Sequence, residues 1–134
     1  SGGFAPLKDV WKTDVVGLCN WRNKNKPQSS KYPKIDVIPS NIIVKPPTAE
    51  LRENQKDSDS LPDYKILDEI LALNIEEMKS EEEIIQKGFE RKVVRKVLKL
   101  LRISEYKRFQ APPGPKLGKK AFGRDRMYPL TNKF

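Results

Sequence analysis

The residues best suited to chemistry in this chain are cations near its C-terminal end. Tyr106, Lys107 and Arg108 follow Glu105 in the stretch EYKRFQAPPGPK. Lysine and arginine both bind carboxylates and phosphates, so the stretch is a candidate binding site for an anionic ligand. The alternative is structural, because a helix dipole favours cations at its C-terminal end, and these residues are expected to end a long helix.

A second candidate is Lys45, which stands directly before the rigid pair Pro46-Pro47. The segment that follows, up to Tyr64, is rich in carboxylates and has no apolar period. A lysine held next to two rigid prolines can bind a polyphosphate, and the carboxylates of a mobile acidic loop beside it can bind the accompanying Mg²⁺. A solvated linker explains the same residues equally well.

The first three residues, SGG, are also how the phosphate-binding loop S-G-G-x-D-S of ATP pyrophosphatases begins. That loop needs its Asp and its second Ser, and it opens a helix after a hydrophobic strand. Here Ala5 and Pro6 stand in those two places, and proline removes a backbone N–H donor. We therefore reject the phosphate-loop interpretation of these residues.

The composition excludes several kinds of site. The chain has no histidine and a single cysteine, so it offers neither an imidazole nor an internal disulfide. That cysteine, Cys19, is expected to be a buried structural thiol on a helix. No apolar run approaches the ~20 residues that span a membrane, and no signal peptide is visible, which favours a cytoplasmic protein.

Charge is distributed unevenly over the 134 residues. The net charge is +9, with −8 over residues 46–90 and +12 over residues 91–134. This asymmetry fits an anionic ligand, a nucleic acid, or pairing between the acidic segment 76–83 and the basic helix that follows it. A basic nucleic-acid-binding or scaffold module is therefore an alternative function, although the sequence contains no base-reading motif.

Helices must position these residues. Apolar spacing predicts helices over about 12–23 and 63–77, and a long basic one over about 91–108. One helical turn is expected before the prolines at 46 and 47. Ser80 and Glu83 form a capping box and Gly88 fits the left-handed position after a helix, which predicts a two-turn helix between them.

The fold class is therefore mainly α, with about three to five helices, long loops and at most one short strand near residues 4–8. Hydrophobic residues make up only 37% of the chain, against about 45–50% in a usual globular domain when glycine is counted. A thin core follows, and the chain looks like a piece of a larger protein. Residues 111–134 have no apolar period, and their aromatic residues indicate an extended tail that docks on another surface.

Four stretches, in order along the chain, resemble one family. They are GGFAPLKDVWKT, IIVKPPTAELRENQKDSDSLPDYKILDEIL, EEIIQKGF followed by VVRKVLKL, and EYKRFQAPPGPKLGKKAFGRDRMYPLTNKF. Together they resemble the C-terminal part of NAD synthetases, which are ATP pyrophosphatases, and the ending AFGRDRMYPLTN is similar to the glutamine-dependent bacterial type. The resemblance implies that residues 1–134 are the C-terminal portion of an α/β, Rossmann-like synthetase domain of the adenine nucleotide alpha-hydrolase type.

The resemblance also implies a reaction. ATP, with Mg²⁺, would adenylate the nicotinate carboxylate of deamido-NAD, and ammonia derived from glutamine would then displace AMP to give NAD. The phosphate loop and the glutaminase residues would belong to upstream segments, so no catalytic residue and no metal ligand is expected here, and the chain alone is expected to be inactive. The family resemblance further implies a homodimer or higher homo-oligomer, without a membrane or nucleic-acid partner.

Individual roles follow only where residues match the family's motifs. Lys45 resembles a lysine that contacts the ATP phosphates, and Lys107 one that reaches deamido-NAD across the dimer interface. Tyr106 takes the place of a histidine in smaller, ammonia-dependent relatives, and Arg108 resembles a supporting cation at the deamido-NAD site. Residues 45–62 resemble a mobile loop that covers the bound adenylate.

Overall fold

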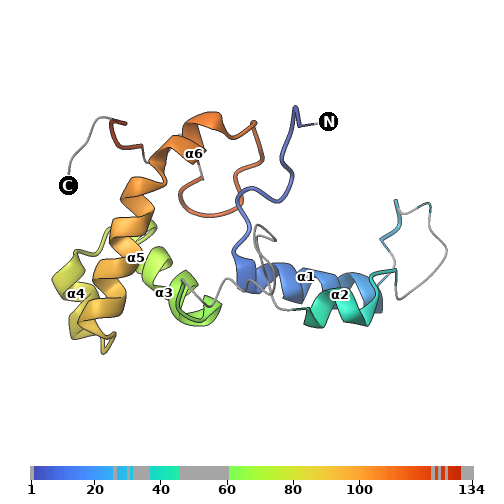
Figure 1. The fold of residues 1–134 in the computed structure, drawn as a ribbon. Coiled ribbons are helices and arrows are strands. Elements are labelled where there is room, and N and C mark those ends of the chain that lie inside the picture. The colour runs from blue at the N-terminus through green and yellow to red at the C-terminus, as the bar shows by residue number, and fades with distance from the viewer. Residues whose placement is uncertain are drawn as a thin grey trace, which may run out of the picture. The chain divides into compact units, whose positions relative to one another are not determined.

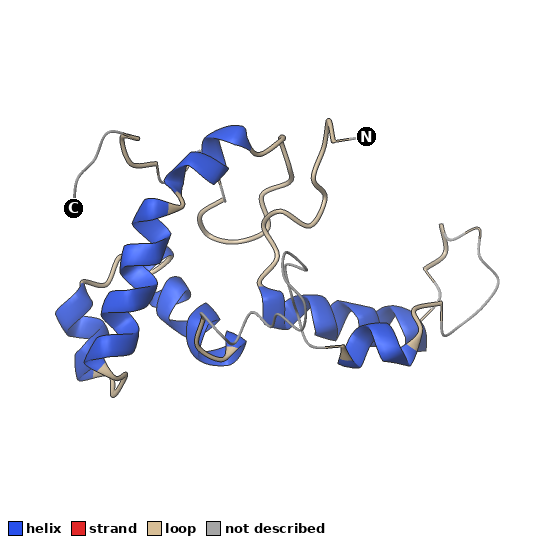
Figure 2. Cartoon of the chain, viewed as in Figure 1, coloured by secondary structure: helices blue, strands red, loops and turns tan. Residues whose placement is uncertain are grey.

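All the regular secondary structure that is described in this chain is helical. The computed structural model describes residues 2–25, 27–29, 31, 37–45, 61–121, 123, 125 and 127–130. Within these residues it forms six α-helices and no strand (Figures 1 and 2). The prediction of a mainly α chain is confirmed. The chain divides into two compact units, Trp11–Tyr64 and the combination of Ser1–Val10 with Lys65–Phe134, which we describe separately.

The unit Trp11–Tyr64 is built on α1 (Lys12–Lys24) and α2 (Ser40–Val44), which contact each other. Asn23 ties α1 to the segment before α2. Its side-chain amide donates to the Ile38 carbonyl at 2.8 Å and accepts from the Ile38 N–H at 2.9 Å. These two hydrogen bonds fix the approach of the chain to α2.

Neither α1 nor α2 has a buried side chain. Cys19 is only half-buried, so the prediction of a buried structural thiol is wrong. Val16, Leu18 and Trp21 are between 45% and 54% exposed. Burial of these apolar side chains therefore did not follow from their residue type.

The other unit holds most of α3 (Tyr64–Ile75) together with α4 (Glu81–Gln86), α5 (Arg91–Ile103) and α6 (Glu105–Gln110). Its buried apolar side chains come from α3, α4 and α5, and they are Leu67, Ile70, Ile84, Val94, Val97 and Leu98. α4 packs on α5, whose buried residues recur at spacings of three and four and so share one face. The core is thin, as the composition predicts.

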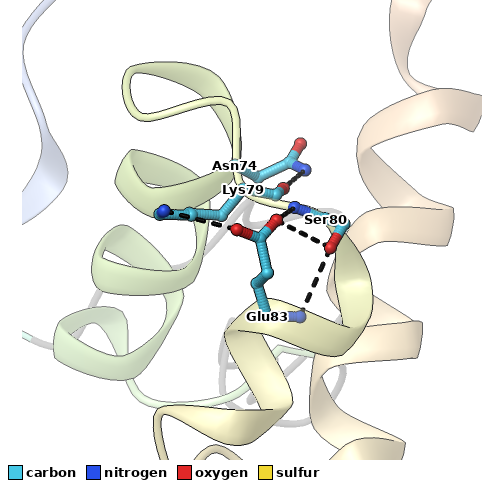
Figure 3. Close-up of polar contacts among 4 residues, drawn as sticks. All are labelled: Asn74, Lys79, Ser80 and Glu83. Carbon is cyan, nitrogen blue, oxygen red and sulfur yellow. Dashed lines mark hydrogen bonds and ion pairs between the residues drawn. The ribbon is translucent and has the colours of Figure 1, made fainter.

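A capping box begins α4. The Ser80 hydroxyl accepts from the Glu83 N–H at 3.3 Å, and the Glu83 carboxylate accepts from the Ser80 N–H at 2.8 Å (Figure 3). The Asn74 side chain donates to the Lys79 carbonyl at 2.9 Å, which holds the turn before the helix. Gly88 follows α4 with a φ of +101°, so both predicted ends of this helix are confirmed.

One predicted boundary is wrong. The sequence predicts a single helix that ends with Glu105–Arg108, but α5 ends at Ile103 and α6 begins at Glu105. Ser104 separates them with a φ of −83° and a ψ of 8°, and its hydroxyl donates to the Leu101 carbonyl at 3.1 Å. Such a local side-chain hydrogen bond competes with helix continuation. The described residues therefore form six helices, one more than the five that the sequence predicts at most. The additional helix is α6, which is separate from α5 (Figure 1).

Residues 4–8 do not form the one short strand that the sequence allowed, and residues 6–9 form a turn instead. The Lys8 N–H donates to the Ala5 carbonyl at 3.2 Å, and the Val10 N–H donates to the Leu7 carbonyl at 3.2 Å. A hydrogen bond from an N–H to the carbonyl three residues earlier makes the backbone turn, so the segment is not an extended strand. The predicted substrate-covering loop, residues 45–62, lies outside the described residues except at its two ends.

Candidate functional site

The two faces of α6 differ in charge and exposure. Glu105 and Arg108 are three residues apart, which places them on one face, and both side chains are only 4% exposed. Arg108 Nε lies 3.5 Å from Glu105 Oε2. Tyr106 is 46% exposed and Lys107 is also exposed. The helix therefore presents an ammonium and a phenol to solvent while it buries an ion pair behind them.

The same buried carboxylate holds the C-terminal tail. The Tyr128 N–H donates to Glu105 Oε1 at 3.1 Å, so one oxygen of Glu105 faces the tail while the other faces Arg108. Burying a charge is costly unless it is paired and hydrogen-bonded. In the structure Glu105 has a charged partner for one oxygen and a backbone donor for the other, and Lys107 is exposed.

The tail also docks on the N-terminal segment of its own unit. Four hydrogen bonds join residues 5–9 to residues 112–118: Ala5 N–H to the Pro113 carbonyl at 2.8 Å, Lys8 Nζ to the Pro112 carbonyl at 2.8 Å, and the N–H groups of Leu117 and Gly118 to the Asp9 carboxylate at 2.6 and 3.0 Å. These hydrogen bonds hold residues 112–118 against residues 5–9. The surface on which the tail docks is the segment that precedes α1.

Two cations of α5 are engaged by α4. Arg91 donates to both oxygens of Glu82 at 2.7 and 3.1 Å, and Arg95 Nε donates to Glu81 at 2.7 Å. The hydrogen bonds from Arg91 lower the pKa of Glu82, and those to Glu82 raise the pKa of Arg91. The predicted pairing of the acidic segment with the basic helix is therefore confirmed for Arg91 and Arg95.

Lys45 lies in the unit Trp11–Tyr64, directly after α2. Its N–H donates to the Asn41 carbonyl at 3.1 Å, and the residue is exposed. Contact with ATP phosphates stays a prediction for Lys45, as contact with deamido-NAD does for Lys107, and each residue is described within its own unit.

A metal site is not formed by the part of the chain that the structure describes. No three of its Cys, Asp and Glu side chains gather closely enough to hold a metal ion. We therefore assign no Mg²⁺ ligand to these residues. Over the same residues, none of the helices combines the length and the apolar character needed to cross a membrane.

Two residues that organise this site were not singled out from the sequence. Glu105 pairs with Arg108 at a spacing of three, a helical spacing that could have revealed the pair. Asp9 had no such signal, because its partners lie more than a hundred residues away in the chain. Arg108 was predicted as a supporting cation. In the structure its guanidinium is buried beside Glu105 and does not lie on the exposed face of α6.

Comparison with known proteins extends this picture. The family model described as NAD synthase matches residues 1–111. The chain belongs to the NAD synthase family. This NAD synthase chain is 48%, 52% and 50% identical, over its whole length, to glutamine-dependent NAD(+) synthetases of Rhodobacter capsulatus, Aquifex aeolicus and Thermotoga maritima. It spans only 22–24% of the length of those relatives.

A solved structure agrees with the family assignment. The glutamine-dependent NAD+ synthetase of Acinetobacter baumannii, in complex with adenosine diphosphate, matches 93% of this NAD synthase chain with a TM-score of 0.52 and 39% identity. The match covers 20% of that protein. The predicted family is therefore confirmed.

Proposed function

We propose that the chain is part of a glutamine-dependent NAD(+) synthetase and that α6 binds deamido-NAD through Lys107 and Tyr106. The observation that carries the proposal is the exposure of these two side chains on a helix whose opposite face is a buried ion pair. The identity of about one half to relatives named as synthetases supports the reaction. A fixed helix that presents a cation is suited to bind an anionic dinucleotide.

The proposed reaction has two steps. The nicotinate carboxylate of deamido-NAD attacks the α-phosphorus of ATP and pyrophosphate leaves, which gives an acyl adenylate. Ammonia released from glutamine then attacks the acyl carbon, and AMP leaves with the electron pair of the broken bond. The first step is needed because a carboxylate oxygen is too poor a leaving group for an amine to displace. Mg²⁺ is expected to accompany ATP, and none of its ligands is assigned to this chain.

The residues have separate roles in this proposal. The Lys107 ammonium neutralises an anionic group of deamido-NAD, and Tyr106 supplies an aromatic face and a hydroxyl beside it. Lys45 neutralises the phosphates of ATP, and residues 45–62 cover the adenylate. Arg108 supports Lys107 indirectly. Its guanidinium is buried with Glu105 on the opposite face of α6 and so does not lie on the exposed face with Lys107.

The proposal extends to the assembly. The complete protein is a cytoplasmic homodimer or higher homo-oligomer in which Lys107 reaches deamido-NAD across the interface. Its upstream synthetase and glutaminase segments supply the phosphate loop and the ammonia, so residues 1–134 alone do not make NAD. Assays of the isolated chain and of the full-length protein, at equal concentration, test this last point.

The deciding experiment is formation of NAD from deamido-NAD, ATP and glutamine by the full-length protein. If folded full-length protein yields no NAD, the proposal is wrong. Lys107→Ala is expected to raise the KM for deamido-NAD by about ten- to a hundredfold, since a hydrogen bond to a charged group contributes about 1.5–3 kcal/mol. Lys92→Ala, which removes an exposed lysine near the start of α5, is the matched control and should leave that KM unchanged.

A further inference from the structure

We propose that Glu105 is a positioning residue for deamido-NAD binding, because its buried carboxylate sets the orientation of α6 and so the exposure of Lys107 and Tyr106. The inference rests on the proposed function, since it takes Lys107 to contact deamido-NAD. It assigns a role in binding to a side chain that itself faces away from any ligand.

The carboxylate of Glu105 joins two separate elements. Its Oε2 lies 3.5 Å from Arg108 Nε within α6, and its Oε1 accepts from the Tyr128 N–H of the tail at 3.1 Å. Glu105 is 3% exposed, so water cannot readily replace either partner. The first residue of α6 is therefore fixed to the tail and to the next turn of its own helix at once.

α6 is held by its contact with α5 and by the polar contacts of its buried side chains. It is six residues long, it is separated from α5 by Ser104, and a helix this short is not stable in isolation. Its large apolar side chain, Phe109, is 50% exposed. Its buried residues are Glu105 and Arg108, both charged. The orientation of α6 thus depends on polar contacts where most surface helices depend on apolar ones.

The geometry of a helix connects this buried pair to the ligand-binding face. With 3.6 residues per turn, successive side chains are about 100° apart, so Lys107 cannot share the face of Glu105 and Arg108. A rotation of α6 by one residue in either direction would carry one member of the pair out of the buried face, and in one direction it would also bury the Lys107 ammonium without a partner of its own. The ion pair therefore selects the orientation in which Lys107 faces solvent.

Glu105→Gln in the full-length protein tests the role. Glutamine keeps the size of the side chain and an acceptor for the Tyr128 N–H, but it removes the charge opposite Arg108. We expect the KM for deamido-NAD to rise about tenfold, because small misplacements of a binding group have large effects, while the KM for ATP changes less than about twofold. Glu77→Gln, at an exposed glutamate after α3, is the matched control and should change neither constant.

A double-mutant cycle with Lys107→Ala separates positioning from a general loss of stability. If Glu105 acts through Lys107, Glu105→Gln adds little to the KM of a protein that already carries Lys107→Ala. A rise of equal size in both backgrounds, or no rise in the single variant, overturns the positioning role while the proposed function stands. If Lys107→Ala itself leaves the KM unchanged, the proposed function of Lys107 fails, and the inference fails with it.

A second variant covers the case in which Glu105→Gln does not fold. Glu105→Asp keeps the charge but draws the carboxylate back by one methylene from Arg108 and from the Tyr128 N–H. We expect a smaller rise in the KM for deamido-NAD, about threefold, that again disappears in the Lys107→Ala background. An unchanged KM in folded Glu105→Asp overturns the inference.

Discussion

Asp9 and Leu117 are 108 residues apart in the sequence, and the Leu117 N–H donates to the Asp9 carboxylate at 2.6 Å. The same carboxylate oxygen accepts from the Gly118 N–H at 3.0 Å. Hydrogen bonds to an ionised acceptor are roughly twice as strong as neutral ones. The tail that contacts Glu105 is therefore held at its other end by a residue that precedes the first helix.

Asp9→Ala should loosen this attachment. Loss of two hydrogen bonds to a charged acceptor is expected to lower the free energy of unfolding by about 1–3 kcal/mol. Hydrogen exchange measured by mass spectrometry should show faster exchange of the peptide that carries the Leu117 and Gly118 amides. Asp14→Ala, at an exposed aspartate in the first turn of α1, is the control and should leave this peptide unchanged. Equal exchange in the Asp9 and Asp14 variants would show that the contact is not held in solution.

Gly114→Ala should disrupt the same contact by overpacking. A Cβ at this position would lie 2.5 Å from the Ala5 carbonyl oxygen and 3.0 Å from the Lys8 Cβ, so the backbone of the tail must move. Overpacking of this kind costs about 1–3 kcal/mol of stability, which urea denaturation can measure. Gly17→Ala has the opposite expected sign, because a Cβ there meets nothing within 4 Å and alanine favours the helix by up to about 1 kcal/mol. A stable Gly114→Ala protein would contradict the close approach.

The capping box of α4 predicts a dependence of stability on pH. Hydrogen bonds from the Ser80 backbone and hydroxyl lower the pKa of Glu83 from 4.5 to about 2. Since the pKa is lower in the folded state, the stabilisation is present above the unfolded value and is lost as the pH falls through the window from about 4.5 to about 2. Glu83→Gln should therefore be less stable than the parent at pH 7, and urea denaturation should show the two converging towards pH 2. A constant difference across this window would contradict the assignment.

Substitutions of Tyr106 should distinguish its aromatic ring from its hydroxyl. The residue is 46% exposed, so the fold should tolerate replacement. Tyr106→Ala is expected to raise the KM for deamido-NAD by about two- to tenfold, the range that corresponds to the 0.5–1.5 kcal/mol of an aromatic contact. Tyr106→His, which introduces the residue of the smaller relatives, should stay close to the parent value. If alanine and histidine have the same effect, the ring has no part in binding.

Features fixed by neighbouring residues were predictable from the sequence. The capping box of Ser80 and Glu83 and the left-handed Gly88 depend on contacts within a few residues, and both are confirmed. The interruption at Ser104 was not predicted, because apolar residues continue beyond it and the hydrogen bond from its hydroxyl to the Leu101 carbonyl is not evident from the sequence. Local pattern thus locates helices better than it locates their breaks.

The candidate site was predictable only in part. The sequence singles out Tyr106 and Lys107 by type and by resemblance, and the structure places both on the exposed face of α6. The sequence does not reveal that Glu105 is buried against Tyr128. That burial depends on where the tail, more than twenty residues further along the chain, packs against α6. The half-exposed Cys19 has the same explanation, since residue type alone does not show what covers a helix.

The long separation of Asp9 from Leu117 sets an order of events during synthesis. Residues 5–9 leave the ribosome before residues 112–118 exist, and at 5–20 residues per second the wait is roughly 5–20 s. The contacts of α4 with α5 are local and close much earlier, so the attachment of the tail completes this unit last. Nascent chains arrested before residue 112 should accordingly leave residues 4–9 open to protease, and release of the finished chain should protect them.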